Sequence, residues 1–167
     1  MTTFTITDDS GFLGIVNADE YSGFVSENWE LPQLIDHFVD QMNEDNLILW
    51  STGAENLLTV AFVKNASNYK AFREFSKTIT VTCRRVFLTN YEDLTVAAQH
   101  EDQKIPADHN ADLLFELENG RHEFLIRQLF NPEDDNYELE GKVHFEVVVQ
   151  HHANTNSQHV DGIFWGA

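Results

Sequence analysis

The sequence has little cysteine and no long apolar run, and its first 63 residues contain no Lys or Arg. The only cysteine among its 167 residues is Cys83, so no internal disulfide can form and the composition fits a reducing compartment. No apolar run approaches the length of a membrane span, and the N-terminus has no basic segment followed by an apolar one. We therefore expect a cytoplasmic protein with no membrane partner.

No Lys or Arg occurs from Met1 to Val63, although this stretch carries eleven carboxylates. The central segment from Lys64 to Arg85 then holds six Lys or Arg residues against one acid, Glu74, and the remainder is acidic again. The formal net charge is −18. Such a charge repels nucleic acid and anionic lipid and speeds association with basic proteins. The expected partner is therefore a basic protein, with no nucleic acid bound.

The sequence also lacks the motifs of common enzyme classes. It has no nucleophile elbow and no glycine-rich phosphate-binding loop. His144, His151, His152 and His159 gather near the C-terminus, but their spacing along an extended chain does not converge on one zinc ion. We expect solvated histidines, no metal or cofactor, and no enzymatic activity.

Aromatic and β-branched residues are plentiful, which separates this chain from disordered acidic proteins. Thirteen Phe, three Trp and four Tyr can supply a core, and the length suits one domain. We expect residues 1–152 to form a single β-rich domain. The tail, residues 153–167, is expected to dock through Ile163, Phe164 and Trp165 because aromatic residues at chain ends tend to pack.

The predicted fold class is α+β: an antiparallel β-sheet or β-sandwich with one amphipathic helix at about residues 32–45. Leu34, Phe38 and Met42 recur there at helical spacing, and Pro32 suits the first turn. Elsewhere apolar and polar residues alternate, which predicts strands. The expected strand segments are a pair within 4–16, 46–50 and 57–63 around a turn, 78–89, 94–98 pairing back across 90–93, a hairpin of 113–118 and 121–130 around Asn119-Gly120, and a central strand at 142–151. Residues 69–77 suit either a short helix or an irregular strand.

Carboxylates in acidic loops and on one strand are the candidate contacts with a basic partner. Glu116 and Glu118 would be about 7 Å apart on one strand face, which resembles the spacing of phosphates along a nucleic-acid strand. Aromatic residues in the acidic loop before the helix are candidate anchors; alternatively they form a small core that pins the loop. The predicted contact residues are Asp19, Glu20, Tyr21, Phe24, Glu27, Trp29, Glu116, Glu118, Glu133, Asp134 and Asp135.

The order of the predicted elements resembles the competence protein J family of DNA-entry nuclease inhibitors. The likeness spans Phe4 to Pro132 in layout, and its residue-level match is the predicted hairpin from Leu114 to Phe124. The resemblance implies a small cytoplasmic protein that binds a nuclease, a role shared by toxin-neutralising immunity proteins. The acidic segment 101–112 and the extension beyond Pro132 depart from the family, so no binding residue is carried over.

We therefore favour a non-enzymatic inhibitor or immunity protein that blocks a basic nuclease toxin, as a monomer or homodimer. Two other hypotheses stay open: a β-sandwich module for a small molecule or glycan, and a metal-dependent enzyme that uses the C-terminal histidines. The charge could also serve solubility alone. An inhibitor needs a free acidic surface, so its case weakens if the segment from Lys64 to Arg85 covers the N-terminal carboxylates.

Overall fold

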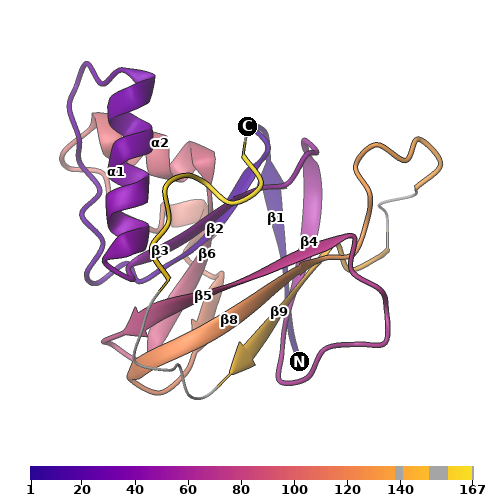
Figure 1. Ribbon diagram of the computed structural model, residues 1–167. Coiled ribbons are helices and arrows are strands. Elements are labelled where there is room, and N and C mark those ends of the chain that lie inside the picture. Colours follow the sequence, from indigo (N-terminus) through magenta and orange to yellow (C-terminus); the bar gives the residue numbers. More distant parts are fainter. Residues whose placement is uncertain (138–140, 151–157, 167) are drawn as a thin grey trace.

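The computed structural model describes residues 1–137, 141–150 and 158–166. Its alternating apolar segments form two sheets, and two α-helices cover the smaller sheet, so the predicted α+β class is confirmed (Figure 1). The strands are β1 (Thr2–Asp8), β2 (Phe12–Val16), β3 (Leu47–Ser51), β4 (Asn56–Val63), β5 (Arg73–Val81), β6 (Arg85–Asn90), β7 (Leu114–Glu116), β8 (Gly120–Gln128) and β9 (Phe145–Gln150). The helices are α1 (Leu31–Asn43), α2 (Tyr91–Gln99) and the short 3-10 helix η1 (Asp108–Asn110).

The two sheets are built from two antiparallel ribbons, each of which bends from one sheet into the other. In the first ribbon β1 pairs with β4, and their neighbours in sequence, β2 and β3, pair in the second sheet. In the second ribbon β5 pairs with β8, and β6 pairs with β7. β9 lies centrally in the larger sheet, as its two apolar faces predicted. The resulting orders are β1-β4-β9-β8-β5 and β3-β2-β6-β7.

These bends explain why the predicted hairpins are wrong although their strands exist. The strands on either side of residues 9–11, and those on either side of residues 52–55, belong to different sheets. At Asn119-Gly120, β7 pairs with β6 while β8 pairs with β5. The Asn119 side chain accepts the backbone N–H of Arg84 at 2.7 Å, and Gly120 has a φ of +128°. These turn residues therefore hold a corner between the sheets instead of a hairpin tip.

The corner of the first ribbon is held by the buried carboxyl of Asp8. Its Oδ1 accepts three successive backbone N–H groups, at residues 10–12, over 2.7 to 3.3 Å. The Thr52 hydroxyl lies 2.6 Å from the Asp8 Oδ2 and 2.7 Å from the Ala54 carbonyl. Burial raises the pKa of Asp8, against the lowering effect of these hydrogen bonds. One carboxyl thus ties the β1–β2 bend to the β3–β4 bend.

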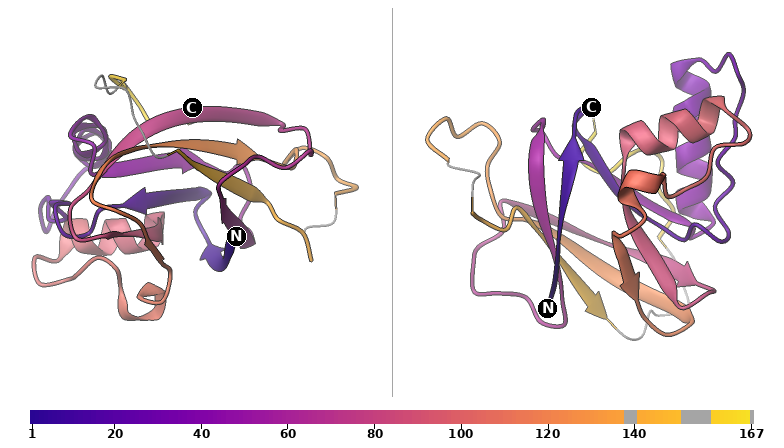
Figure 2. Two further views of the ribbon diagram at one scale, coloured as in Figure 1. Left: turned by 90° about the horizontal axis from the view of Figure 1, so that it is seen from below. Right: turned by 180° about the vertical axis from the view of Figure 1, so that it is seen from behind.

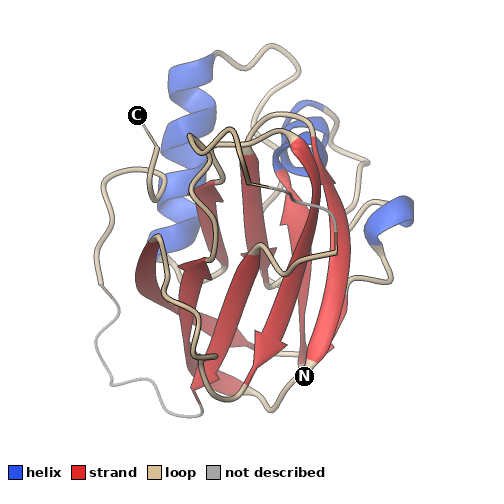
Figure 3. Ribbon diagram, turned by 90° about the vertical axis from the view of Figure 1, so that its right-hand side faces the viewer, coloured by secondary structure: helices blue, strands red, loops and turns tan. Residues whose placement is uncertain are grey.

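Two apolar clusters separate the three layers. The first lies between the sheets and includes Trp50, Phe62 and Phe145. The second lies between the smaller sheet and the helices and includes Phe38 of α1 and Leu94 of α2. Both helices consequently lie on one side of the sheets, as three further views of the molecule also show (Figures 2 and 3).

Helix α1 lies where its periodicity predicted it, with Glu30 and Gln33 forming a capping box. Helix α2 was missed, because residues 94–98 were expected to form a strand. Its N-cap is Asn90, whose side chain accepts the N–H of Asp93 at 3.0 Å. Asn and Asp favour turns and helix N-termini alike, so the segment 90–93 suited both interpretations.

The end of the chain lies along the edge of β3. Phe164 donates its N–H to Leu49 and accepts the N–H of Ser51, at 3.2 and 2.9 Å. Its ring stacks on Phe75 with centroids 3.8 Å apart, and the Arg73 guanidinium lies 4.4 Å from the centroid of the Trp165 ring. Residues 158–166 thereby cover an edge strand whose backbone groups would otherwise be free to pair with another chain.

A buried ion pair joins the end of α1 to β5. The Lys77 side chain is fully buried, and its Nζ lies 2.7 Å from Asp45 Oδ1, while Arg121 reaches Asp45 Oδ2 at 3.1 Å. Asp45 has a φ of +62°, a conformation that Asn tolerates well. Since a buried charge is costly unless it is paired, Lys77 depends on this carboxylate.

We predict that Asp45→Asn lowers the free energy of unfolding by about 3 kcal/mol, because it removes the carboxylate that lies 2.7 Å from the buried Lys77 ammonium. Urea denaturation followed by circular dichroism measures this loss. The matched control is Asp40→Asn, which removes an exposed charge from α1 and should change stability by less than about 0.5 kcal/mol. Equal losses in the two variants would show that the ion pair is not needed.

Candidate protein-binding surface

The acidic residues of this protein concentrate around its two α-helices. We define the helical layer as residues 17–46 and 91–112, the segments that hold α1, α2, η1 and the loops beside them. Of the 28 acidic and 10 basic residues in the chain, the helical layer contains 14 and one, which gives it a charge of −13. The remaining 14 acids and nine bases leave only −5 for the rest of the chain.

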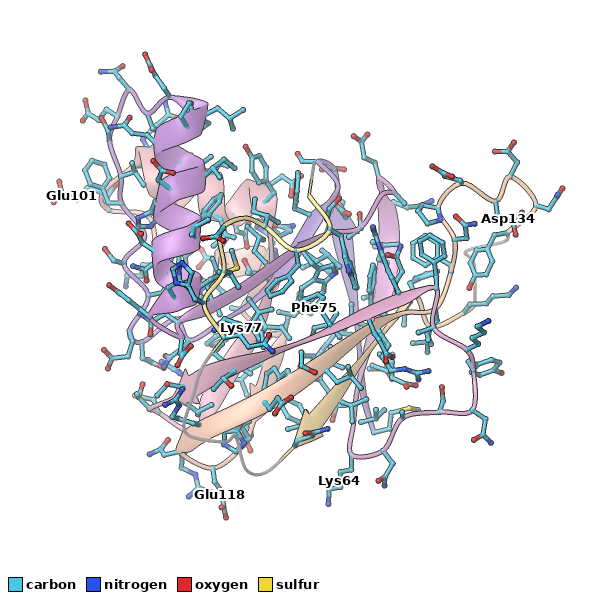
Figure 4. All side chains as sticks on the ribbon, viewed as in Figure 1. Lys64, Phe75, Lys77, Glu101, Glu118 and Asp134 are labelled. Atoms are coloured by element: carbon cyan, nitrogen blue, oxygen red, sulfur yellow. The ribbon has the colours of Figure 1, made fainter. Side chains whose placement is uncertain are left out.

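The central basic segment neutralises little of this charge. Arg85 binds Asp19 through hydrogen bonds of 3.0 and 2.6 Å, and Lys77 binds Asp45. Lys64, by contrast, lies far from α1 (Figure 4). Within the described residues, eight of the eleven N-terminal carboxylates are exposed and form no salt bridge. These are Asp9, Glu20, Glu27, Glu30, Asp36, Asp40, Glu44 and Glu55.

Helix α1 arranges part of this charge in a row. Asp36 and Asp40 of α1 and its C-cap residue Glu44 recur every four residues and are all exposed, so they lie on one side of the helix, about 6 Å apart along its axis. The other side buries Leu34 and Phe38 in the second apolar cluster. The same amphipathic pattern that docks the helix therefore also exposes its carboxylates.

The three predicted aromatic anchors divide into two kinds. Phe24 is 37% exposed. Tyr21 and Trp29 pack against the second apolar cluster. They therefore pin the acidic loop to the domain, as expected if these aromatic residues form a small core. Burial raises the pKa of the Tyr21 hydroxyl. Of these aromatic side chains, Phe24 is therefore the one that a partner could contact without rearrangement of the loop.

Two further exposed apolar residues, Leu31 and Val96, were missed from sequence. They are 57% and 45% exposed. Leu31 begins α1, and its place in the helix periodicity gave no signal of exposure. Phe24 lies beside α2, because the N–H groups of Val25 and Ser26 both donate to the carbonyl of Ala98. Phe24 and Val96 thus belong to the same part of the helical layer.

The other predicted contact residues lie elsewhere. Glu116 ends β7, Glu118 lies at the corner after it, and residues 133–135 belong to the loop after β8. Figure 4 shows Glu101, Glu118 and Asp134 at three separate positions around the molecule. The eleven predicted residues therefore do not form one continuous surface. The helical layer is the part of the molecule with the largest negative charge.

The structure describes two of the four C-terminal histidines, His144 and His159. Nδ1 of the buried His144 accepts the N–H of Thr59 at 2.7 Å. His151 and His152 lie outside the described residues, and within those residues no cluster of His, Cys, Asp or Glu is suited to a metal ion. Cys83 lies within the segment 78–89 that was expected to be a strand, but it is exposed in the turn between β5 and β6. None of the described helices is long and apolar enough to span a bilayer.

Comparison with known proteins finds relatives in structure only. No family model matches the sequence, and no curated protein matches it either. A structure titled "Crocagin biosynthetic gene J" matches with a TM-score of 0.55 and 11% identity, covering 88% of this chain and 94% of the other. The structure of ComJ from Bacillus subtilis, described as an inhibitor of the DNA-degrading activity of NucA, matches with a TM-score of 0.50 and 10% identity. The latter match covers 89% of this chain and 92% of ComJ.

The resemblance to the competence protein J family is therefore confirmed as a likeness of fold. The match to ComJ covers more of the chain than the span from Phe4 to Pro132 that the layout suggested. The residues that carried the likeness in sequence do not form a hairpin, so the element order and not the local motif was the informative signal.

The loop over α1 is held more by apolar packing than by polar side chains. Tyr21 Oη, Trp29 Nε1 and His37 Nε2 are buried and have no hydrogen-bond partner among the described residues. Burial lowers the pKa of His37 below its ordinary value of about 6.5, although Ser22, Asp40 and Glu44 act in the opposite direction. The folded state therefore favours neutral His37, and the unfolded state binds its proton more readily.

We predict that His37 makes the protein less stable in mild acid. Its contribution is present above about pH 6.5 and is lost as the pH falls through the lowered pKa of the folded state. The free energy of unfolding should therefore drop less between about pH 7.5 and about pH 5.5 in His37→Asn than in the wild type. The control is His100→Asn, at an exposed histidine, which should keep the wild-type slope. If His37→Asn keeps that slope as well, the burial of His37 has no such effect.

Proposed function

We propose that this protein is a non-enzymatic inhibitor, of the immunity-protein kind, that binds and blocks a basic nuclease. The observation that carries the proposal is the helical layer, with its charge of −13 and six exposed N-terminal carboxylates that form no salt bridge within the described residues. The fold it shares with ComJ, an inhibitor of the DNA-degrading activity of NucA, adds support.

Charge and apolar contacts have different roles in such a complex. The acidic field steers a cationic partner and raises the association rate, an effect that salt screens over about 8 to 10 Å. Exposed Phe24, Leu31 and Val96 supply the apolar area that holds the complex together after encounter. A surface that combines the two is better suited to binding than one that serves solubility alone.

Blocking follows from what a nuclease cleft recognises. Such a cleft is cationic because it contacts the phosphates of a nucleic-acid backbone. The row of Asp36, Asp40 and Glu44 offers carboxylates about 6 Å apart along α1. A nuclease that accepts this row in its cleft cannot accept DNA at the same time, so inhibition requires no chemistry by the inhibitor.

The direct test is inhibition of DNA degradation. The protein should lower, at near-stoichiometric amounts, the activity of a cationic nuclease such as NucA or one encoded beside its own gene. Rising salt should slow complex formation, which stopped-flow fluorescence can measure. Failure to bind any cationic nuclease tested, or association that ignores salt, would overturn the proposal.

Reversal of charge on α1 should weaken the electrostatic attraction that guides a cationic nuclease to this surface. We predict that Asp36→Lys with Asp40→Lys lowers the association rate at low salt by about tenfold or more. Glu133→Lys with Asp135→Lys makes the same charge change in the loop after β8 and should have a much smaller effect. Equal slowing by both pairs would mean that net charge, and not the helical layer, governs binding.

Removal of the exposed aromatic ring should affect dissociation. We predict that Phe24→Ala raises the Kd about fivefold to tenfold, mainly through faster dissociation, since truncation of an anchor costs about 1 kcal/mol or more. Surface plasmon resonance separates the two rates. Tyr69→Ala truncates a ring that is 74% exposed but outside the helical layer, and should leave both rates unchanged. Equal effects of the two variants would contradict the assignment of Phe24.

A further inference from the structure

The larger sheet carries a groove on the face turned away from the core. Two neighbouring hollows, of about 600 and 360 Å³, share Leu129 and Tyr137 in their lining. Ala61 and Glu146, which line the larger hollow, each lie between two core-facing residues on their strands and so face outward. Volumes of this size with mostly apolar walls are typical of sites for small molecules.

A buried ion pair holds one wall of the groove in place. Arg127 lies 2.6 Å from Glu146, and both side chains are less than 10% exposed. Glu146 accepts the N–H of Ser67 at 2.9 Å, and Arg127 donates to the carbonyls of Ser67 and Tyr69. The loop between β4 and β5, which contributes Ser67 and Tyr69 to the larger hollow, is therefore fixed onto the sheet before any ligand arrives.

Among the described residues that line the groove, the charged side chains that form no salt bridge are lysines. Lys142 lines the larger hollow, with its Nζ 4.7 Å from the centroid of the Tyr137 ring, and Lys70 lines the smaller one. Within the described residues neither lysine has a salt bridge. Among the described lining residues the one carboxylate is that of Glu146, and it is paired with Arg127. Residues 133–135 do not line either hollow.

We propose that this groove binds a small amphipathic anion, with an aromatic body and one acidic group. Tyr69 and Tyr137 provide aromatic walls for the body, and Lys142 provides the charge for the acidic group. The Ser67 hydroxyl is buried without a hydrogen-bond partner among the described residues, so a polar ligand atom could satisfy it after a small movement. The site is separate from the helical layer and does not depend on the proposed inhibition.

The test uses 8-anilinonaphthalene-1-sulfonate, an aromatic anion that fluoresces in apolar sites. We expect saturable binding to the folded wild-type protein, and weaker binding of the uncharged analogue N-phenyl-1-naphthylamine. Lys142→Glu should weaken binding of the anion about tenfold or more, because an attractive charge becomes repulsive. Lys104→Glu makes the same change on the helical layer, at an exposed position, and should leave the affinity unchanged.

Tyr69→Ala provides a second variant at an exposed position, which should remain folded and bind the anion more weakly. Thermal unfolding confirms that each variant is folded, which excludes dye binding to a loosened core. Three results would overturn the proposal: no saturable binding, equal affinity for the charged and uncharged probes, or equal loss in the Lys142 and Lys104 variants. In each case the groove would not recognise an aromatic anion.

Discussion

Each of the two ribbons bends as it passes from the larger sheet into the smaller one, and the structure depends on these two bends. At the first bend, the Asp8 carboxyl gathers three backbone N–H groups and the Thr52 hydroxyl. At the second, the Asn119 side chain bonds the backbone of Arg84. Backbone groups at a sharp bend lose their ladder partners, so they need side-chain acceptors in their place. Without these corners the strands would continue as two flat hairpins with no enclosed core.

The bends also determine where the connecting segments emerge. Residues 17–46, which contain α1, join β2 to β3, and residues 91–113, which contain α2, join β6 to β7. Each helix therefore lies in the connection between the two strands of one ribbon, at the end of that ribbon in the smaller sheet. The loop between β4 and β5 and the loop between β8 and β9 connect strands of the larger sheet. One topological feature thus separates an acidic helical layer from a groove lined by lysines and aromatic residues.

Buried charges reinforce this arrangement at both places. Asp45 and Lys77 join the end of α1 to the edge of the larger sheet, and Arg127 with Glu146 fixes the β4–β5 loop. Ion pairs of this kind add little net stability compared with apolar packing, but they penalise any arrangement that separates the partners. They therefore fix the positions of the helical layer and of the groove wall. A purely apolar contact would specify these positions less strictly.

Much of this protein follows from local sequence. The alternation of apolar residues located most strands, and the periodicity at Leu34 and Phe38 located α1. The absence of Lys and Arg up to Val63 predicted an acidic surface. Tertiary structure alone decided that Asn119-Gly120 is a corner, that residues 91–99 form a helix, and that Tyr21 and Trp29 are packed while Phe24 is exposed. The physical reason is that periodicity reports only which face of a segment is buried. Strand partners, and the side of the molecule on which a charge lies, depend on contacts between residues far apart in sequence.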